Sequence, residues 1–177
     1  MSNARLTVTS YVVLGMIALR GPSTSYDLKR AVGHSVGYFW PFPHAQLYSE
    51  PKKLVDLGLL HVSAEDEGRR RLTYSITDEG MAALKAWMAE PSDDPMQVRD
   101  VGQLKLFFGE VAEPKDLVAL AEQQIELHRD RIAVYEQMQA RFGGLDEVAP
   151  RMVPLQLGLE LERAALAFWE RLHAERA

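Results

Sequence analysis

The hydrophobic pattern of the first 90 residues changes its period twice. Apolar residues first recur at three- and four-residue steps, as in Val13, Met16 and Ile17, which indicates helices packed by one face. After Gly58 the apolar residues alternate with polar ones, as at Leu60 and Val62, which is typical of a strand. The pattern predicts, in chain order, helices over residues 10–20, 25–32 and 43–57, strands over 59–63 and 69–76, and a fourth helix over 78–90.

Side chains that suit helix caps mark the starts of three of these helices. Thr9 can cap the first helix and Thr77 the fourth, because a threonine hydroxyl accepts a hydrogen bond from an unpaired backbone amide of the first turn. Thr24 and Asp27 have the spacing of a capping box at the start of the second helix.

A short polar segment separates this pattern from a second one that is helical throughout. Glu90-Pro91-Ser92-Asp93-Asp94-Pro95 combines two prolines with small and acidic side chains, as linkers do. Apolar residues at helical spacing then predict helices over residues 98–109, 114–142 and 150–176. We therefore expect a first domain over residues 1–90, a linker over 91–96 and a helical domain over 97–177.

The order of the elements predicts a mainly α chain. Three helices, a β-hairpin wing and a fourth helix describe an N-terminal winged helix-turn-helix, a domain that places its third helix in the major groove of DNA. In the second domain, Val118, Leu127 and Val134 lie off the main apolar stripe of the long helix. A helix with apolar residues on more than one side needs partners on both sides, so we expect a C-terminal helical dimerisation domain.

Composition is that of an ordinary globular chain. The 177 residues are 47% hydrophobic and 25% charged, and the longest apolar run, residues 11–19, is far short of the ~20 residues that a membrane span requires. The absence of cysteine excludes disulfides and cysteine-ligated metals. The N-terminal residues lack the pattern of a secretory signal, and we expect a cytoplasmic protein without membrane contact.

Charge is divided unevenly between the two halves. The net charge is −5, which for the whole chain argues against nucleic acid. Residues 1–90 hold ten Lys/Arg against nine Asp/Glu, a net of +1, whereas residues 91–177 hold ten against sixteen, a net of −6. A DNA-binding surface must therefore be a local patch on the first half.

Several motifs of the chain, taken in order, resemble the PadR family of bacterial transcriptional regulators. They are Tyr26-Asp27-Leu28-Lys29, then Gln46-Leu47-Tyr48-Ser49-Glu50-Pro51-Lys52-Lys53-Leu54-Val55-Asp56-Leu57-Gly58-Leu59-Leu60, then Arg70-Arg71-Leu72-Thr73-Tyr74-Ser75-Ile76-Thr77-Asp78-Glu79-Gly80. Leu104-Lys105-Leu106-Phe107-Phe108-Gly109 is similar to the start of the longer helical C-terminal domain of that family. The resemblance implies a homodimer that binds a palindromic operator in double-stranded DNA, usually as a repressor, and in some members release by a small molecule.

One residue departs from the family pattern. Pro51 lies inside the predicted recognition helix, where the family more often has leucine. Proline removes the bond from its own nitrogen to the carbonyl of Leu47, so the helix is expected either to kink there or to start only after a turn. Either change would re-aim His44, Gln46 and Tyr48.

Polar residues of the third helix and of the wing are the candidates for DNA contact. Gln46 can pair with adenine, while Tyr48 and Ser49 can reach phosphate oxygens. The alternative is that these side chains, the lysines included, are ordinary solvated residues, or, for the arginines of the wing, that they balance the charge of Glu65, Asp66 and Glu67. The candidate DNA-binding residues are His44, Gln46, Tyr48, Ser49, Lys52, Lys53, Arg70 and Arg71.

Four aromatic residues are candidates for binding a small aromatic effector. Tyr11, Trp40, Phe107 and Trp169 are candidates for lining its pocket, and core packing is the alternative for all four.

The sequence predicts no enzyme, no cofactor and no metal site. The histidines lack metal-ligand spacing, and the chain has no phosphate-binding loop or nucleophile motif. The competing hypothesis to a DNA-binding regulator is a helical dimerisation or adaptor protein whose winged helix does not bind DNA.

Overall fold

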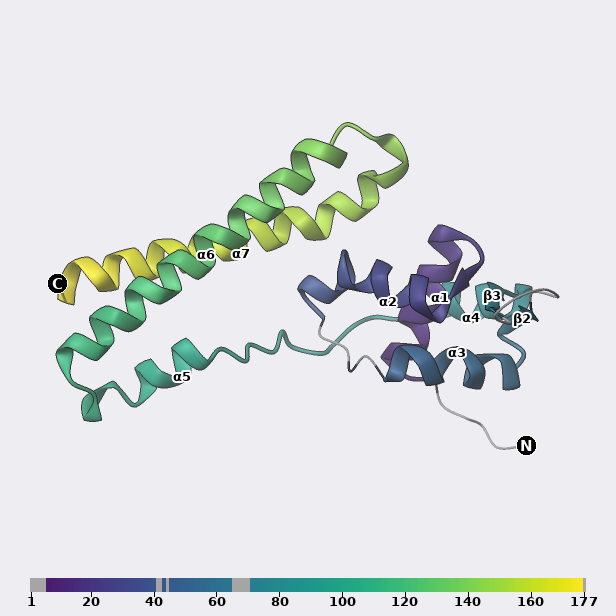
Figure 1. Cartoon of the computed structure of the whole chain (residues 1–177), viewed down its shortest axis with the longest axis horizontal. Helices are drawn as coiled ribbons and strands as arrows, with labels where there is room; N and C mark the ends of the chain where they lie inside the picture. Colours follow the sequence, from purple (N-terminus) through teal and green to yellow (C-terminus); the bar gives the residue numbers. More distant parts are fainter. Residues whose placement is uncertain (1–5, 41–42, 44, 65–70, 177) are drawn as a thin grey trace. The chain divides into compact units, whose positions relative to one another are not determined.

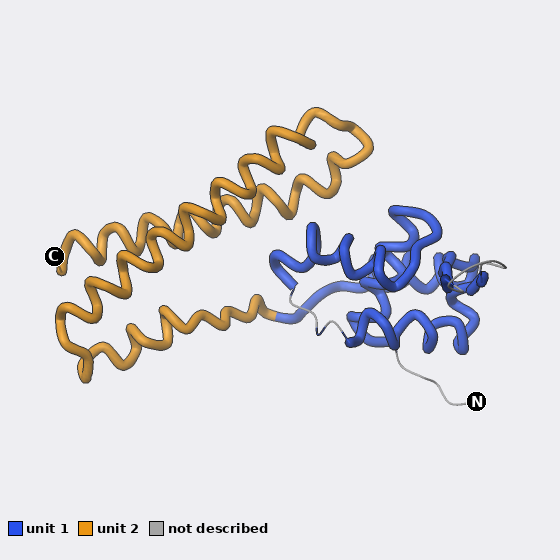
Figure 2. Tube along the Cα trace, viewed as in Figure 1, with its two compact units in different colours: residues 1–94 blue, residues 95–177 orange. Residues whose placement is uncertain are grey.

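The structure is a computed structural model that describes residues 6–40, 43, 45–64 and 71–176. It divides into two compact units, residues 1–94 (unit 1) and residues 95–177 (unit 2) (Figure 2). Unit 1 contains helices and a small antiparallel sheet, and unit 2 is helical in its described residues. This confirms the predicted fold class, a mainly α chain with a winged helix followed by a helical domain.

Unit 1 is built around a central helix, α1 (Figure 1). α1 contacts α2, α3, α4 and β3, and buries Val13, Leu14 and Ile17 at 1% exposure or less. Because these three residues fall on one side of a 3.6-residue period, α1 supplies the largest share of the core. The elements of unit 1 are α1 Val8–Arg20, β1 Ser23–Thr24, α2 Ser25–Gly33, the 3₁₀ helix η1 Val36–Tyr38, α3 Gln46–Asp56, β2 Leu60–Ala64, β3 Leu72–Ile76 and α4 Asp78–Ala89.

The sheet of unit 1 has three antiparallel strands in the order β1-β3-β2. The predicted hairpin is present, with Leu60 opposite Ile76 and Val62 opposite Tyr74. The added strand β1 pairs Thr24 with Thr73. This short strand joins the wing to the start of α2.

Helix α1 begins two residues earlier than predicted, and its cap is Thr7 rather than Thr9. The Thr7 hydroxyl accepts from the amide of Ser10 at 3.4 Å, and the Ser10 hydroxyl accepts from the amide of Thr7 at 2.9 Å. These reciprocal bonds form a capping box whose first residue lies two residues before the expected cap.

The predicted capping box of α2 is confirmed. The Thr24 hydroxyl accepts from the amide of Asp27 at 3.2 Å, and the Asp27 carboxylate accepts from the hydroxyl of Thr24 at 2.7 Å and from its amide at 3.2 Å. These bonds from Thr24 lower the pKa of Asp27, the nearby charges of Arg30 and Arg71 lower it further, and partial desolvation opposes them.

Unit 2 is dominated by α6 (Pro114–Phe142) and α7 (Ala149–Arg176), which lie side by side in opposite directions (Figure 1). Leu120, Ala121, Ile125 and Trp169 form the buried centre of this pair. The predicted helix over residues 98–109 is shorter in the structure: Asp100 caps α5 (Val101–Phe107), and a 3₁₀ turn, η2 (Gly109–Val111), follows. A further 3₁₀ turn, η3 (Asp146–Val148), joins α6 to α7.

Polar contacts to Glu162 reinforce the packing of α6 on α7. Nδ1 of His128 lies 2.5 Å from Oε2 of Glu162, and Arg131 binds the other carboxylate oxygen at 3.1 Å. Within the residues that the structure describes, no helix has both the length and the hydrophobicity for crossing a membrane.

Candidate nucleic-acid interface

Helix α3 separates its side chains cleanly between core and solvent. Leu47, Pro51 and Leu54 recur at four- and three-residue steps and are all buried. Gln46, Tyr48, Ser49 and Lys52 are exposed in the same helix. Since the apolar face fixes α3 against unit 1, the polar face is held outward in a constant orientation.

Pro51 is accommodated inside a continuous helix. α3 starts at Gln46 rather than at Pro43, so five helical residues, Gln46 to Glu50, precede the proline. The amide of Gln46 donates to the carbonyl of Pro43 at 2.9 Å, which places a tight turn directly before α3. The ring of Pro51 is buried in the core of unit 1, in the position where an aliphatic side chain would otherwise pack.

Two hydrogen bonds tie α3 to the first turn of α1. The Ser10 hydroxyl donates to Oε1 of Glu50 at 2.5 Å, and the Thr9 hydroxyl donates to Oε1 of Gln46 at 3.0 Å. Sequence reasoning missed this tether. The available signal was Ser10 itself, because a hydroxyl three residues before Val13 on the apolar face of α1 needs a buried partner.

The two lysines of α3 have different surroundings. Lys53 binds Glu50 at 3.2 Å, and its side chain is 39% exposed. Lys52 is exposed and has no ion pair with any described carboxylate. Lys52 therefore keeps its charge available to an anion, whereas Glu50 partly neutralises that of Lys53. The hydroxyl of Ser49 lies 3.4 Å from two carbonyls of its own helix, those of Ala45 and Gln46.

Part of the predicted interface lies outside the described residues, namely His44 and, in the wing, Arg70. Arg71 is exposed directly before β3. Its charge acts on Asp27 at the start of α2, which places the base of the wing beside that helix end.

The four aromatic residues proposed for an effector pocket have different environments. Tyr11 stacks on Trp87, with ring centroids 4.6 Å apart and planes inclined by 6°. Trp40 of unit 1 and Phe107 of unit 2 are exposed, at 46% and 81%. Trp169 is buried between α6 and α7 at 3% exposure and packs with Leu166 and Leu172, so it serves the core of unit 2. Ligand contact by Tyr11, Trp40, Phe107 and Trp169 stays a prediction.

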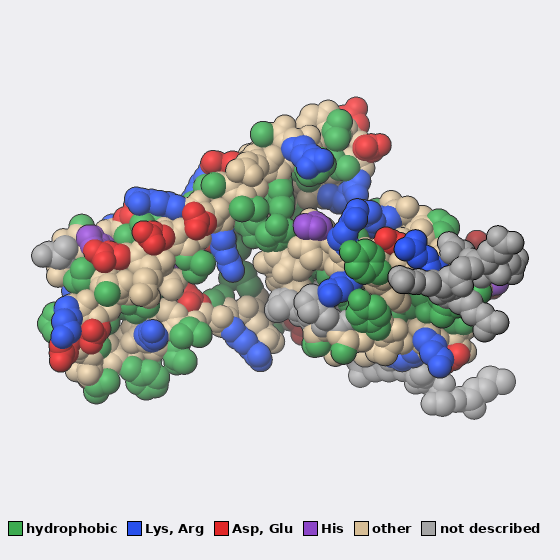
Figure 3. Space-filling view, viewed as in Figure 1, with side chains coloured by type: hydrophobic (Ala, Val, Ile, Leu, Met, Phe, Trp, Pro, Cys, Tyr) green, Lys and Arg blue, Asp and Glu red, His purple; other side chains and the backbone are tan. Residues whose placement is uncertain are grey.

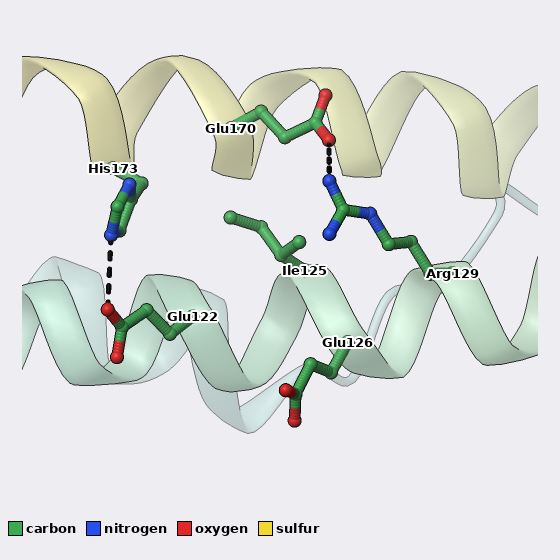
Figure 4. Close-up of a pocket in the computed structure, with 6 residues that line it drawn as sticks. All are labelled: Glu122, Ile125, Glu126, Arg129, Glu170 and His173. Carbon is green, nitrogen blue, oxygen red and sulfur yellow. Dashed lines mark hydrogen bonds and ion pairs between the residues drawn. The ribbon is translucent and has the colours of Figure 1, made fainter.

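An open groove of unit 2 runs between α6 and α7 and contains none of these four aromatic residues (Figure 4). Arg129 binds Glu170 at 2.6 Å and His173 binds Glu122 at 3.2 Å, on either side of Ile125 (Figure 4). These two contacts bridge α6 and α7 and help to hold the two helices together.

Unit 2 also exposes a row of hydrophobic side chains. Val153, Leu157, Leu161 and Phe168 are all exposed on α7, and their spacing of four, four and seven residues puts them on one face. Hydrophobic side chains also gather at the surface over α5 and η2, at the lower left of Figure 3. Exposed apolar rows of this length mark surfaces that another protein surface covers.

Two sequence families match the chain in succession. Residues 13–86 match the transcriptional regulator PadR-like family, and residues 98–175 match the family described as virulence activator alpha C-term. The two matches follow the division into unit 1 and unit 2.

Similar proteins cover nearly the whole chain. The negative transcriptional regulator PadR of Bacillus subtilis is 25% identical over 178 residues, covering 96% of this chain and 97% of the relative. The crystal structure of B. subtilis PadR in complex with operator DNA aligns with a TM-score of 0.87 at 23% identity, covering 97% of this chain and all of that one. The structure of the same regulator in complex with p-coumaric acid aligns with a TM-score of 0.76 at 24% identity, covering 95% and 94%.

Proposed function

Because the chain belongs to the PadR-like family of transcriptional regulators, we propose that it binds a palindromic operator in double-stranded DNA as a homodimer and represses transcription. The observation that carries the proposal is the division of α3 into a buried apolar face and an exposed polar face within a winged helix. A helix held in this way can enter the major groove, which is about 12 Å wide. Its relative B. subtilis PadR has been solved with operator DNA.

The residues of the interface have two kinds of role. Gln46, at the start of α3, meets base edges, and His44 lies just before it in the chain. Tyr48, Ser49 and Lys52 contact phosphates from the exposed face of α3. Lys53 contributes less because Glu50 holds its ammonium group. Arg70 and Arg71 of the wing bind the flanking backbone or a narrow minor groove.

The homodimer is supported by the exposed apolar row on α7. Val153, Leu157, Leu161 and Phe168 span about four turns of helix, and an identical row on a second copy can cover them around a twofold axis. A palindromic operator then follows from the symmetry of the protein, because each copy presents one α3 to one half-site.

A small aromatic molecule is the proposed effector. The relative solved with p-coumaric acid supports this class of ligand. Tyr11, Trp40 and Phe107 supply aromatic surface outside the core of unit 2, and Trp169 lies within that core. A regulator that acts on the bacterial chromosome works in the cytoplasm, which is where we place this protein.

The test is selection of bound duplexes from a random pool, followed by titration of the best sequence at several salt concentrations. We expect a palindromic consensus and a linear fall of log affinity with log salt, because phosphate contacts release counterions. Absence of any enriched sequence, with no salt-dependent binding, would support the adaptor alternative instead.

A further inference from the structure

The first turn of α1 holds α3 at two points one helical turn apart. Thr9 donates to Oε1 of Gln46 at 3.0 Å, and its neighbour Ser10 donates to Oε1 of Glu50 at 2.5 Å. Gln46 and Glu50 are four residues apart, so their side chains leave α3 on the same side. Two adjacent hydroxyls of α1 therefore engage two adjacent side chains along one edge of α3.

The inner of these two contacts is withdrawn from solvent. Ser10 is fully buried, and the side chain of Glu50 is 12% exposed. The Ser10 hydroxyl is held in turn by Thr7, whose amide donates to it at 2.9 Å. Rotation of α3 about its own axis would break a buried hydrogen bond to a carboxylate, and this keeps Gln46 within reach of Thr9.

The outer contact decides which end of the Gln46 amide is available. Oε1 lies against Thr9, and Nε2 occupies the other branch of the carboxamide. In the described part of the chain, no hydrogen bond joins Nε2 to another residue, and Gln46 as a whole is exposed. Because Oε1 faces Thr9, the branch of the amide turned away from α1 is the Nε2 donor.

We propose, on the basis of the proposed DNA-binding function, that Thr9 is a positioning residue that makes Gln46 read DNA as a donor. Bidentate pairing with adenine needs the amide oxygen to accept from N6 while the nitrogen donates to N7. With its oxygen held by Thr9, Gln46 donates instead to O6 or N7 of guanine or to O4 of thymine. Guanine and thymine offer this donor only hydrogen-bond acceptors, whereas adenine sets the N6 donor beside its N7 acceptor, so guanine or thymine is favoured over adenine.

The experiment compares the base preferences of four full-length proteins on one random duplex pool: the wild type, Thr9→Val, Thr9→Ser and Gln46→Ala. Valine keeps the shape of Thr9 but removes its hydroxyl, and serine keeps the hydroxyl. Gln46→Ala identifies the base position that Gln46 reads. Thermal melting confirms folding, and Thr9→Ala replaces the valine variant if valine impairs it.

We expect Thr9→Val to change preference at the position identified by Gln46→Ala and nowhere else. Adenine should gain roughly threefold to tenfold there, the equivalent of one hydrogen bond, and Thr9→Ser should match the wild type. The slope of log affinity against log salt should not change, because no charge is altered.

Two results would overturn the inference while leaving the proposed function intact. They are a wild-type preference for adenine at the Gln46 position, and a Thr9→Val profile identical to that of the wild type. A wild-type protein that enriches no sequence would instead overturn the proposed function, and the inference with it.

Discussion

The hydroxyl of Ser10 and the carboxylate of Glu50, 40 residues apart in the chain, form a 2.5 Å hydrogen bond between α1 and α3. Replacing Ser10 by alanine leaves a nearly buried carboxylate without this partner and opens the capping box of α1. We expect a loss of about 1–3 kcal/mol in the free energy of unfolding, measured by urea denaturation.

Ser49→Ala is the matched control for that prediction. Its hydroxyl is exposed and lies 3.4 Å from carbonyls of its own helix, so its loss should cost less than about 0.5 kcal/mol. Equal stability of Ser10→Ala and Ser49→Ala would show that the link between α1 and α3 contributes nothing to folding.

Local signals in the sequence predicted those parts of the fold that depend on neighbouring residues. The capping box of Thr24 and Asp27 closes within one turn. α6 runs from Pro114 to Phe142 as predicted, because a proline occupies its first position and a pair of glycines follows its last residue. The start of α1 could not be read in this way. Thr7 and Thr9 both suit a cap, but the hydroxyl of Thr9 binds Gln46 of α3, 37 residues away, and Thr7 forms the cap.

For the same reason, only part of the candidate site could be predicted from the sequence. The exposed polar face of α3 follows from helical spacing around Leu47 and Leu54. The bond from Thr9 to Gln46 joins residues 37 positions apart, so the spacing of residues along the chain does not predict it. β1 was missed because a two-residue strand has no period to detect.

Asp27 predicts a specific dependence of stability on pH. Its pKa is lowered in the folded chain, first by the Thr24 hydroxyl, from an ordinary value of 3.8. The unfolded chain therefore binds this proton at a higher pH than the folded chain. The stabilisation is present above about pH 3.8 and is lost as the pH falls through the lower folded pKa.

Thr24→Val should raise the pKa of Asp27 toward its ordinary value, and carboxyl NMR titration measures it. Thr24→Ser retains the hydroxyl and should keep the pKa low. An unchanged Asp27 pKa in the valine variant would assign the shift to the backbone amide of residue 24 and to Arg30 and Arg71 instead.

The exposed row on α7 predicts where a charge disrupts the homodimer. Leu157 lies in the row, so Leu157→Glu would bury a carboxylate between two copies. We expect the dimer dissociation constant, measured by sedimentation, to rise about tenfold or more. Gln156→Glu adds the same charge at an adjacent exposed residue outside the row and should leave the constant nearly unchanged. Equal effects of the two variants would move the interface away from this face.

Lys52 and Lys53 test whether the exposed face of α3 meets phosphate. They are adjacent in sequence, but among the described residues only Lys53 has an ion pair, at 3.2 Å from Glu50. Removing a lysine that neutralises a phosphate should flatten the plot of log affinity against log salt by about 0.9 per subunit. We expect that change for Lys52→Ala and a smaller one for Lys53→Ala, whose loss also frees the charge of Glu50. Both variants should weaken all DNA sequences alike, since phosphate contacts carry no base information. A larger slope change for Lys53→Ala would mean that Glu50 releases Lys53 on binding and that α3 presents its other edge to the DNA.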